Sequence, residues 1–296
     1  MSHGRAVATM LVVALLWSIA GVVTRHLESA RAFEITFWRS LFNALTLLAV
    51  LSWQRGPTAL AASMRRAGFL LWASGLCWAV MFTAFMVALT LTTVANVLVT
   101  MALAPLFTAL AARLALGHRL PGRTWGAIVL AGLGIGWMYG QQLGIDAGEH
   151  GLGTAVALAV PLAAAFNWTL MQHARARSAG ELDMAPAALI GAALSALATL
   201  PLAMPLAASG WDLGLLALLG SVQLALPCLL LVGAARVLSA PEVSLLALAE
   251  VVFGVAWAWL GAGEAPQGAA LAGGGLVLLA LAGNEMLGLR DARRLG

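Results

Sequence analysis

Residues 67–112 form a stretch of 46 positions without a charged residue or a histidine. A helix crosses the hydrocarbon core of a bilayer with about 20 predominantly apolar residues, so this stretch is too long for one span. We split it near Thr92 and Thr93 into a tight hairpin of two helices. A soluble protein could not hide so much apolar surface, because its outside must face water.

The rest of the chain has the same character. Of the 296 residues, 62% are hydrophobic and 9% are charged, whereas a typical soluble domain is about 25% charged. We interpret the first apolar run as a retained helix rather than a signal peptide, because it is long for the apolar region of a signal. The predicted membrane helices are 6–24, 35–53, 67–89, 94–112, 124–140, 152–172, 184–205, 213–235, 240–260 and 267–287. No loop between them is long enough to form a soluble domain.

The basic residues are all arginines, sixteen in number, and the chain has no lysine. They lie in short loops and form no basic face, so we expect no nucleic-acid partner. Without lysine the ATP-binding motif GxxxxGK[ST] cannot occur. Cys77 and Cys228 lie inside apolar runs, outside any CxxC or Cys/His cluster, so we expect reduced thiols, no metal site and no cofactor.

The distribution of arginines predicts the orientation in the membrane. With ten spans both termini lie on one side, and that side collects thirteen arginines. The opposite side has three, namely Arg25, Arg31 and Arg39. Because loops rich in Lys and Arg stay in the cytoplasm, we expect both termini to be cytoplasmic in a multi-pass protein of a bacterial inner (plasma) membrane.

A shift of 145 residues relates the two halves of the chain. It pairs Ala102-Leu-Ala-Pro105 with Ala247-Leu-Ala-Glu250, and Gly75 with Gly220. A repeat unit of five helices is odd, so the second copy enters the membrane inverted, as in many secondary transporters. We therefore predict an all-α integral membrane fold with ten transmembrane helices. Residues 1–145 and 146–296 would form two inverted five-helix repeats around a central cavity.

Four short motifs add a resemblance that covers nearly the whole chain. They are Trp17-Ser18, Phe37-Trp38-Arg39-Ser40, Ala104-Pro105-Leu106-Phe107, and Glu250-Val251-Val252 followed by Gly263-Glu264. Together they resemble the EamA branch of the drug/metabolite transporter superfamily. The departures are His118 after Gly117, where the family often has Gly-Glu, and Val251 in place of the commoner proline.

The resemblance implies ten helices in two inverted bundles around a central cavity. It also implies transport of metabolites such as amino acids and their relatives, usually outward. It does not fix the substrate, because the superfamily carries amino acids, amines, nucleotide sugars and drugs.

Glu250 is the most informative residue for function. It lies midway along the predicted helix 240–260, where a carboxylate is costly and usually marks a substrate or proton path. It suits a proton-coupled or an amine-binding role. The alternative is a structural acid that bonds to a neighbouring helix, and the coupling ion stays open.

Aromatic and amide side chains predict the rest of the site. The 145-residue shift maps Trp78 onto Gln223 and Phe82 onto Pro227, each pair on one helix face, which suggests an aromatic wall opposite a polar one. Asn43 and Asn167 could contact the substrate, or they could form hydrogen bonds between helices. The predicted substrate-binding residues are Trp17, Asn43, Trp78, Phe82, Met101, Asn167, Trp168, Gln223, Glu250 and Trp257. The predicted hinges are Pro105, Pro161 and Pro227, and no catalytic residue is predicted.

Arg39 has two interpretations. It lies about one turn inside the outer end of its predicted helix, where we expect it to snorkel to the interface. The alternative is a contact with a substrate carboxylate.

These observations favour a secondary transporter that works by alternating access. Its partners are a small-molecule substrate, the lipid bilayer and, as an open alternative, protons; a monomer and a homodimer both fit. Amino acids or related metabolites are the first substrate class, and an organic-cation or drug carrier is the alternative. A channel or scramblase is less favoured, because the sequence has no filter-like motif. A membrane-embedded enzyme is less favoured, because the sequence shows no nucleophile beside a base and no paired acids.

Overall fold

The structure is a computed structural model of the chain. It describes residues 1–24, 26–66, 68–91, 97, 100–101, 103–116, 121–139, 151–177, 183–262 and 268–295. Within these ranges the regular structure is helical and no strand occurs, so the all-α prediction is confirmed. The predicted hairpin turn at Thr92 and Thr93 lies outside the described residues, as do His118 and Gly263-Glu264.

The described helices follow one another along the chain in two halves. The first half contains α1 (His3–Ser18), α2 (Ala20–Thr24), α3 (Ala32–Arg55), α4 (Pro57–Arg66), α5 (Gly68–Leu91), α7 (Ala104–Leu116) and α8 (Gly122–Tyr139). The second half contains α9 (Gly151–Arg177), α10 (Ala185–Ala203), α11 (Gly210–Leu218), the π-helix η2 (Leu219–Ala225), α12 (Leu226–Ala234), α13 (Ala240–Ala247), α14 (Ala249–Ala262) and α15 (Gly268–Leu295).

Six helical segments of the described chain are long and apolar enough to cross a bilayer. They are His3–Thr24, Phe33–Arg55, Gly68–Leu89, Leu152–Ala176, Ala185–Ala203 and Gly210–Ala234. Each overlaps one of the ten predicted spans. Ala104–Leu114 and Leu271–Asn284 are apolar but shorter. The protein is therefore a multi-pass membrane protein, and the full set of ten spans stays a prediction.

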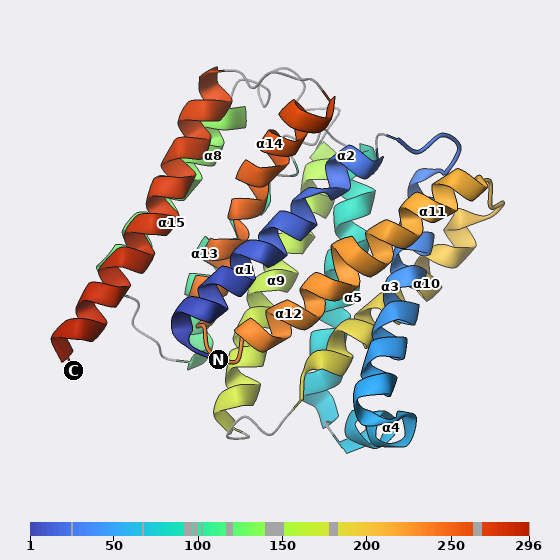
Figure 1. Cartoon of the computed structure of the whole chain (residues 1–296), viewed down its shortest axis with the longest axis horizontal. Helices are drawn as coiled ribbons and strands as arrows, with labels where there is room; N and C mark the ends of the chain where they lie inside the picture. The colour runs from blue at the N-terminus through green and yellow to red at the C-terminus, as the bar shows by residue number, and fades with distance from the viewer. Residues whose placement is uncertain are drawn as a thin grey trace.

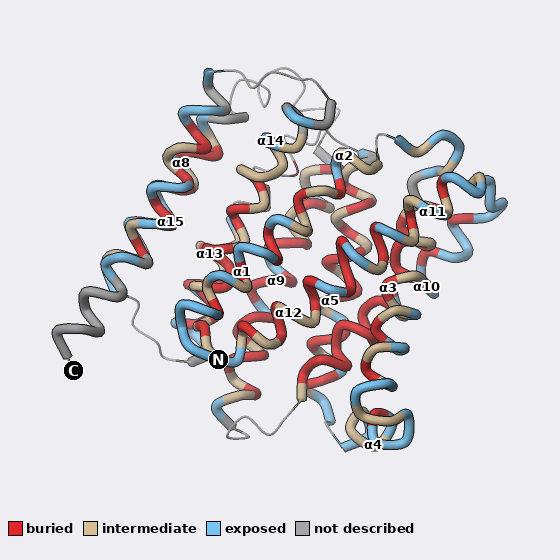
Figure 2. The backbone as a smooth tube through the Cα atoms, in the orientation of Figure 1, coloured by how far each residue is buried: buried red, intermediate tan, exposed pale blue. Residues whose placement is uncertain are grey.

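The outer surface suits lipid rather than water. Trp53 is 87% exposed, Phe69 81% and Leu114 86%. A soluble protein rarely exposes large apolar patches of this kind. Figure 2 shows that exposed positions recur along the outer helices, while buried positions face the inside of the bundle.

The two halves of the chain build one shared core. The largest cluster of buried apolar residues takes Met10 from α1, Leu47 from α3, Trp78 from α5, Ile190 from α10 and Leu231 from α12. In the packing, α3 lies against α10 and η2, α5 against α9 and α10, and α1 against α12, α13 and α14. Figure 1 shows α8 and α15 side by side at one edge of the bundle, and these two helices pack on each other.

Glycine allows the closest approaches between helices. A Cβ on Gly75 of α5 would lie 2.6 Å from Cγ2 of Ile190 in α10. A Cβ on Gly220 of η2 would lie 2.6 Å from the carbonyl oxygen of Arg39 in α3. Real Cβ atoms do not approach other atoms so closely, so α5–α10 and η2–α3 pack almost backbone to backbone at these points.

Three predicted helices are interrupted. The first breaks at Ile19, where the Ser18 hydroxyl donates to the Leu15 carbonyl and competes with the helical ladder. The span 213–235 widens into η2 just before Pro227, which has no backbone N–H to donate. The span 240–260 breaks at Leu248, between α13 and α14.

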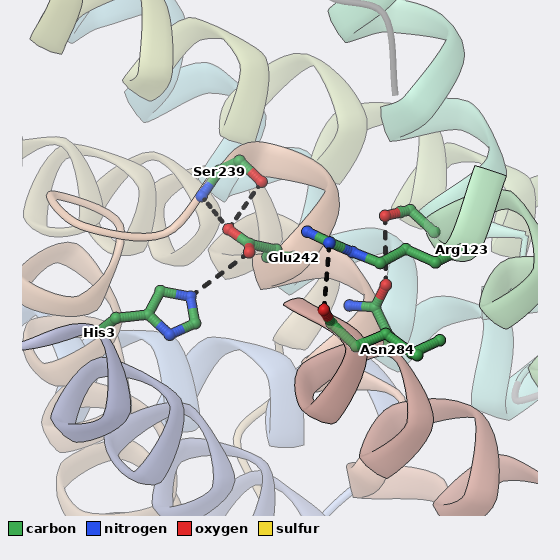
Figure 3. A network of polar contacts seen from close by, with 7 residues as sticks. His3, Arg123, Ser239, Glu242 and Asn284 are labelled. Carbon is green, nitrogen blue, oxygen red and sulfur yellow. Dashed lines mark hydrogen bonds and ion pairs between the residues drawn. The ribbon is translucent and has the colours of Figure 1, made fainter. Parts of the chain in front are cut away.

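Polar contacts fasten the ends of the bundle. Figure 3 shows His3 of α1 beside Glu242 of α13 at 3.4 Å, with Glu242 also capping its own helix through Ser239. Thr124 of α8 donates to Asn284 of α15, and Figure 3 labels Asn284 beside Arg123 of α8. At another end the carboxylate of Asp212 in α11 accepts from the backbone N–H groups of Glu28, Ser29 and Ala30.

Candidate functional site

A cavity of about 110 Å³ lies between the two halves of the bundle. Its walls are mostly apolar and aromatic, with a few polar groups, as is usual for sites that hold small molecules. The first half contributes Trp17, Arg39, Trp78, Met81, Phe82, Phe85, Met101 and Ala104. The second half contributes Val160, Pro161, Ala164, Trp168, Gln223, Leu224, Ser244, Ala247, Leu248, Glu250 and Val251.

The structure brings most of the predicted site residues to this one cavity. Those that line it are Trp17, Trp78, Phe82, Met101, Trp168, Gln223 and Glu250, together with the predicted hinge Pro161. The remaining predicted residues, Asn43, Asn167, Trp257, Pro105 and Pro227, are not among its lining residues. Binding of substrate by any of these residues stays a prediction.

Three aromatic rings form a continuous wall of the cavity. The centroids of Trp78 and Phe82, one turn apart on α5, lie 5.3 Å from each other. Trp168 of α9 meets Trp78 edge to face, with 5.4 Å between centroids. These separations are typical of favourable aromatic pairs. Because the rings lock one another in place, the wall presents a fixed apolar surface to a ligand.

Arg39 does not snorkel to the interface, so that expectation was wrong. Its side chain is 5% exposed and lines the cavity. Helix α3 begins at Ala32 rather than near residue 35, which places Arg39 about two turns inside the helix. The guanidinium lies 5.9 Å above the ring of Phe85, and its Nε donates to Oε1 of Gln223 at 3.3 Å.

Gln223 connects Arg39 to the first helix. Its Nε2 donates to the backbone carbonyl of Trp17 at 3.0 Å. Trp17 lies next to the interruption at Ile19. The amide is 2% exposed and uses both of its ends, so it joins α1, α3 and η2 at the cavity wall.

Glu250 lies in the first turn of α14, directly after the interruption at Leu248. The predicted position halfway along an unbroken helix is therefore corrected: the carboxylate lies at a helix N-terminus, where the macrodipole favours negative charge. Glu250 is half-buried, and among the described residues its carboxylate has no hydrogen-bond or ion-pair partner. Arg39 lines the same cavity from α3.

The predicted residues outside the cavity have structural surroundings. Asn167 accepts from the Ser74 hydroxyl at 2.6 Å. Asn43 is fully buried, and its amide nitrogen and oxygen have no partner among the described residues. Pro227 occupies the start of α12. Pro105 is the second residue of α7, where a proline sacrifices no helical hydrogen bond.

Trp257 lies on α14, and its indole nitrogen is buried without a partner among the described residues. Pro161 lies inside the long helix α9. Over the part of the chain that the structure describes, no group of three His, Cys, Asp or Glu side chains could hold a metal ion.

The family model of the EamA-like transporter family matches residues 4–140. Over these residues, a little under half of its length, the chain is similar to the EamA-like transporter family. The matched part runs from α1 through α8, and it supplies Trp17, Arg39 and the aromatic wall of α5. Members of that family are transporters, which is consistent with the multi-pass membrane architecture of this chain.

Two further comparisons concern the whole chain. No curated protein matches it. A solved structure described as "Crystal structure of protein" has a TM-score of 0.80 and 20% sequence identity, with 99% of each chain covered. At this identity the likeness concerns the fold alone, and it extends over both halves.

Proposed function

We propose that this EamA-like protein is a secondary transporter of amino acids or closely related zwitterionic metabolites. It would bind them in the cavity and release them on the other side by alternating access. Export from a bacterial cytoplasm is the direction that the family resemblance implies. Protons are the coupling ion to test first, because Glu250 is the acidic residue that lines the cavity.

One observation carries the proposal: Arg39 and Glu250 line the same apolar cavity from different helices. A guanidinium binds a carboxylate with charge-assisted hydrogen bonds, and a carboxylate does the same for an ammonium group. An α-amino acid presents both groups on one carbon. The rings of Trp78, Phe82 and Trp168 would then receive its side chain, which favours aromatic or large apolar amino acids.

The packing supports the inverted repeat, an architecture that many transporters working by alternating access share. Trp78 and Gln223 are repeat mates at the shift of 145 residues, and Trp17 pairs with Trp168 at the slightly larger shift of 151 residues. Trp78 contacts Trp168, and Gln223 contacts Trp17, so equivalent residues make equivalent contacts. The close approaches of Gly75 to α10 and of its mate Gly220 to α3 follow the same rule.

Counterflow in proteoliposomes tests the proposal. Vesicles loaded with unlabelled phenylalanine should take up labelled phenylalanine faster than empty vesicles, and the uptake should saturate. Phenethylamine, which lacks the carboxylate, and 3-phenylpropionate, which lacks the amine, should compete less well. Loss of one charged hydrogen bond is worth roughly tenfold or more in affinity.

Two variants assign the charged ends. Arg39→Met should reduce the preference for phenylalanine over phenethylamine. Glu250→Gln should reduce the preference for phenylalanine over 3-phenylpropionate. A wild-type protein that transports none of these compounds would sink the proposal. So would variants that keep both preferences.

An organic-cation carrier is the second candidate, because Glu250 and the tryptophans of the cavity suit a cation. It predicts the reverse order, with phenethylamine above phenylalanine. Under that reading Arg39→Met would improve transport by removing a like charge. If Glu250→Gln transports normally at every pH, Glu250 has no role in proton coupling.

A further inference from the structure

Gln223 lies where the sequence predicted a polar wall, but the structure gives its amide two fixed partners. Oε1 accepts from Nε of Arg39, and Nε2 donates to the carbonyl of Trp17. The side chain is buried, so neither bond competes with bulk water. A glutamine bonded at both ends has one orientation, and its oxygen therefore faces Arg39.

The bond to Gln223 fixes which edge of the Arg39 guanidinium remains for a ligand. Nε is used, and the central carbon of the guanidinium lies over the ring of Phe85, 5.9 Å from its centroid. The two terminal nitrogens have no hydrogen-bond partner among the described residues, and they are not among the buried unpaired atoms. Since Arg39 lines the cavity, this free edge suits a two-pronged contact with a carboxylate.

The local backbone explains why Gln223 can reach both partners. It lies within η2, where the helix has widened before Pro227, and π-turns often occur at functional sites. Gly220, three residues earlier, lets η2 approach the backbone of Arg39 and Asn43. The interruption at Ile19 lies two residues beyond Trp17, whose carbonyl Gln223 binds.

We infer that Gln223 is a positioning residue that holds Arg39 in a binding orientation, so that its two terminal nitrogens meet the carboxylate of the substrate. This inference rests on the proposed function, because it names the substrate group that Arg39 receives. A pre-ordered guanidinium binds more tightly because less freedom is lost on binding. Gln223 thereby sets the preference for carboxylate-bearing substrates without contact to the carboxylate.

A double-mutant cycle on ligand binding tests the inference. The purified protein, Gln223→Met, Arg39→Met and the double variant are each titrated with phenylalanine and with phenethylamine. Gln223→Met should lower the preference for phenylalanine by about tenfold, the worth of a charged hydrogen bond. In the Arg39→Met background the same change should have no further effect. An unchanged preference in Gln223→Met, or effects that multiply in the double variant, would overturn the inference.

Gln172 provides the matched control. It is another buried glutamine that joins two helices, with its Oε1 accepting from the Ala240 N–H at 2.8 Å, and it does not line the cavity. Gln172→Met should lower thermal stability and leave the preference for phenylalanine unchanged. If it shifts the preference as Gln223→Met does, general loosening explains both and the positioning role is wrong.

A ligand-free measurement separates the inference from the proposed function. Apparent melting temperatures of the same four proteins without ligand report whether Gln223 and Arg39 are coupled. The decreases in melting temperature of the two single variants should add up to more than the decrease of the double variant. If the wild-type protein binds neither compound, the proposed function fails. Non-additive melting temperatures would then still support the pairing, and additive ones would overturn it.

Discussion

At the scale of single residues, the carboxylates of Asp212 and Glu250 have contrasting surroundings. Asp212 is fully buried and saturated by donors: three backbone N–H groups of residues 28–30, the Ser29 hydroxyl and the N–H of Ser209. Glu250 has no partner among the described residues and lines the cavity. A saturated carboxylate stabilises a fold, whereas an unsaturated one is available to a ligand.

We predict that Asp212→Asn lowers the apparent melting temperature by several degrees without changing ligand preference. The amide nitrogen of Asn is a hydrogen-bond donor and would face backbone N–H groups, which are also donors, so those hydrogen bonds would be lost. Ser29→Ala removes one of these bonds and should cost less. Thermal unfolding in detergent, followed by loss of monodisperse protein, measures both. Equal stability of Asp212→Asn and wild type would show that the cluster does not hold residues 28–30.

The sequence predicted most of the cavity lining because the repeat offset and the aromatic residues identify helix faces. It failed for Arg39 because its depth depends on where α3 begins. The two turns before Arg39 carry Glu34, a charged residue that the apolar-run criterion places outside the helix. In the structure Glu34 is fully buried and accepts from the N–H groups of Ala207 and Ala208. The pattern of residues around Glu34 cannot reveal a hydrogen-bond partner that is 173 residues away in the sequence.

At the scale of helices, the sequence predicted where apolar segments lie but not where they break. Hydrophobicity does not show where the backbone hydrogen bonds of a helix are interrupted, so the runs 6–24 and 240–260 were predicted as continuous helices. Only Pro227 signalled a break in the span 213–235. The three interruptions adjoin Trp17, Gln223 and Glu250, all of which line the cavity. Broken helices at a binding site are a feature of many transporters.

Close helix packing at Gly220 gives the prediction at this scale. In Gly220→Ala, the new methyl group would lie 2.5 Å from Cβ of Phe42 and 2.6 Å from the Arg39 carbonyl oxygen. We expect a loss of about 1–3 kcal/mol, as for other overpacked cores. Gly233→Ala is the control, because nothing lies within 4 Å of its Cβ position. There we expect a neutral effect or a gain of up to about 1 kcal/mol from helix propensity.

Both variants can be compared by unfolding in detergent and by ligand preference. Because Gly220 contacts the backbone that carries Arg39, Gly220→Ala should also weaken the preference for carboxylate-bearing ligands. A Gly220→Ala protein as stable as Gly233→Ala would mean that η2 and α3 are farther apart than the structure places them.

At the scale of the whole molecule, exchanging the two halves preserves the pattern of packing. Helix α5 lies on α9 as α12 lies on α1, and α7 lies on α9 as α13 and α14 lie on α1. In the pairs α3–α10, α7–α13 and α8–α15, each helix packs on its own counterpart in the other half, so the exchange leaves these pairs unchanged. The two inverted five-helix units that we predict would produce such an exchange, and they would place residues 145 positions apart at mirrored depths in the membrane.

The orientation of the chain in the membrane is the last prediction. The excess of arginine on one side predicts that both termini and α4 face the cytoplasm, while the loop between α10 and α11 faces outward. In a protein with Cys77→Ala and Cys228→Ala, single cysteines can be placed at exposed positions. Thr58→Cys lies on α4, Leu206→Cys lies in the outward loop, and a cysteine added after Gly296 reports the C-terminus.

A membrane-impermeant maleimide applied to intact cells should label Leu206→Cys alone. The other two sites should react only after the inner membrane is permeabilised. Labelling of Thr58→Cys from outside would invert the molecule, and the substrate-exit direction proposed for the cavity would invert with it. Labelling of the C-terminal cysteine but not Thr58→Cys would require an odd number of spans. An odd number is incompatible with two equal five-helix repeats, and the symmetric packing of the two halves would then need another explanation.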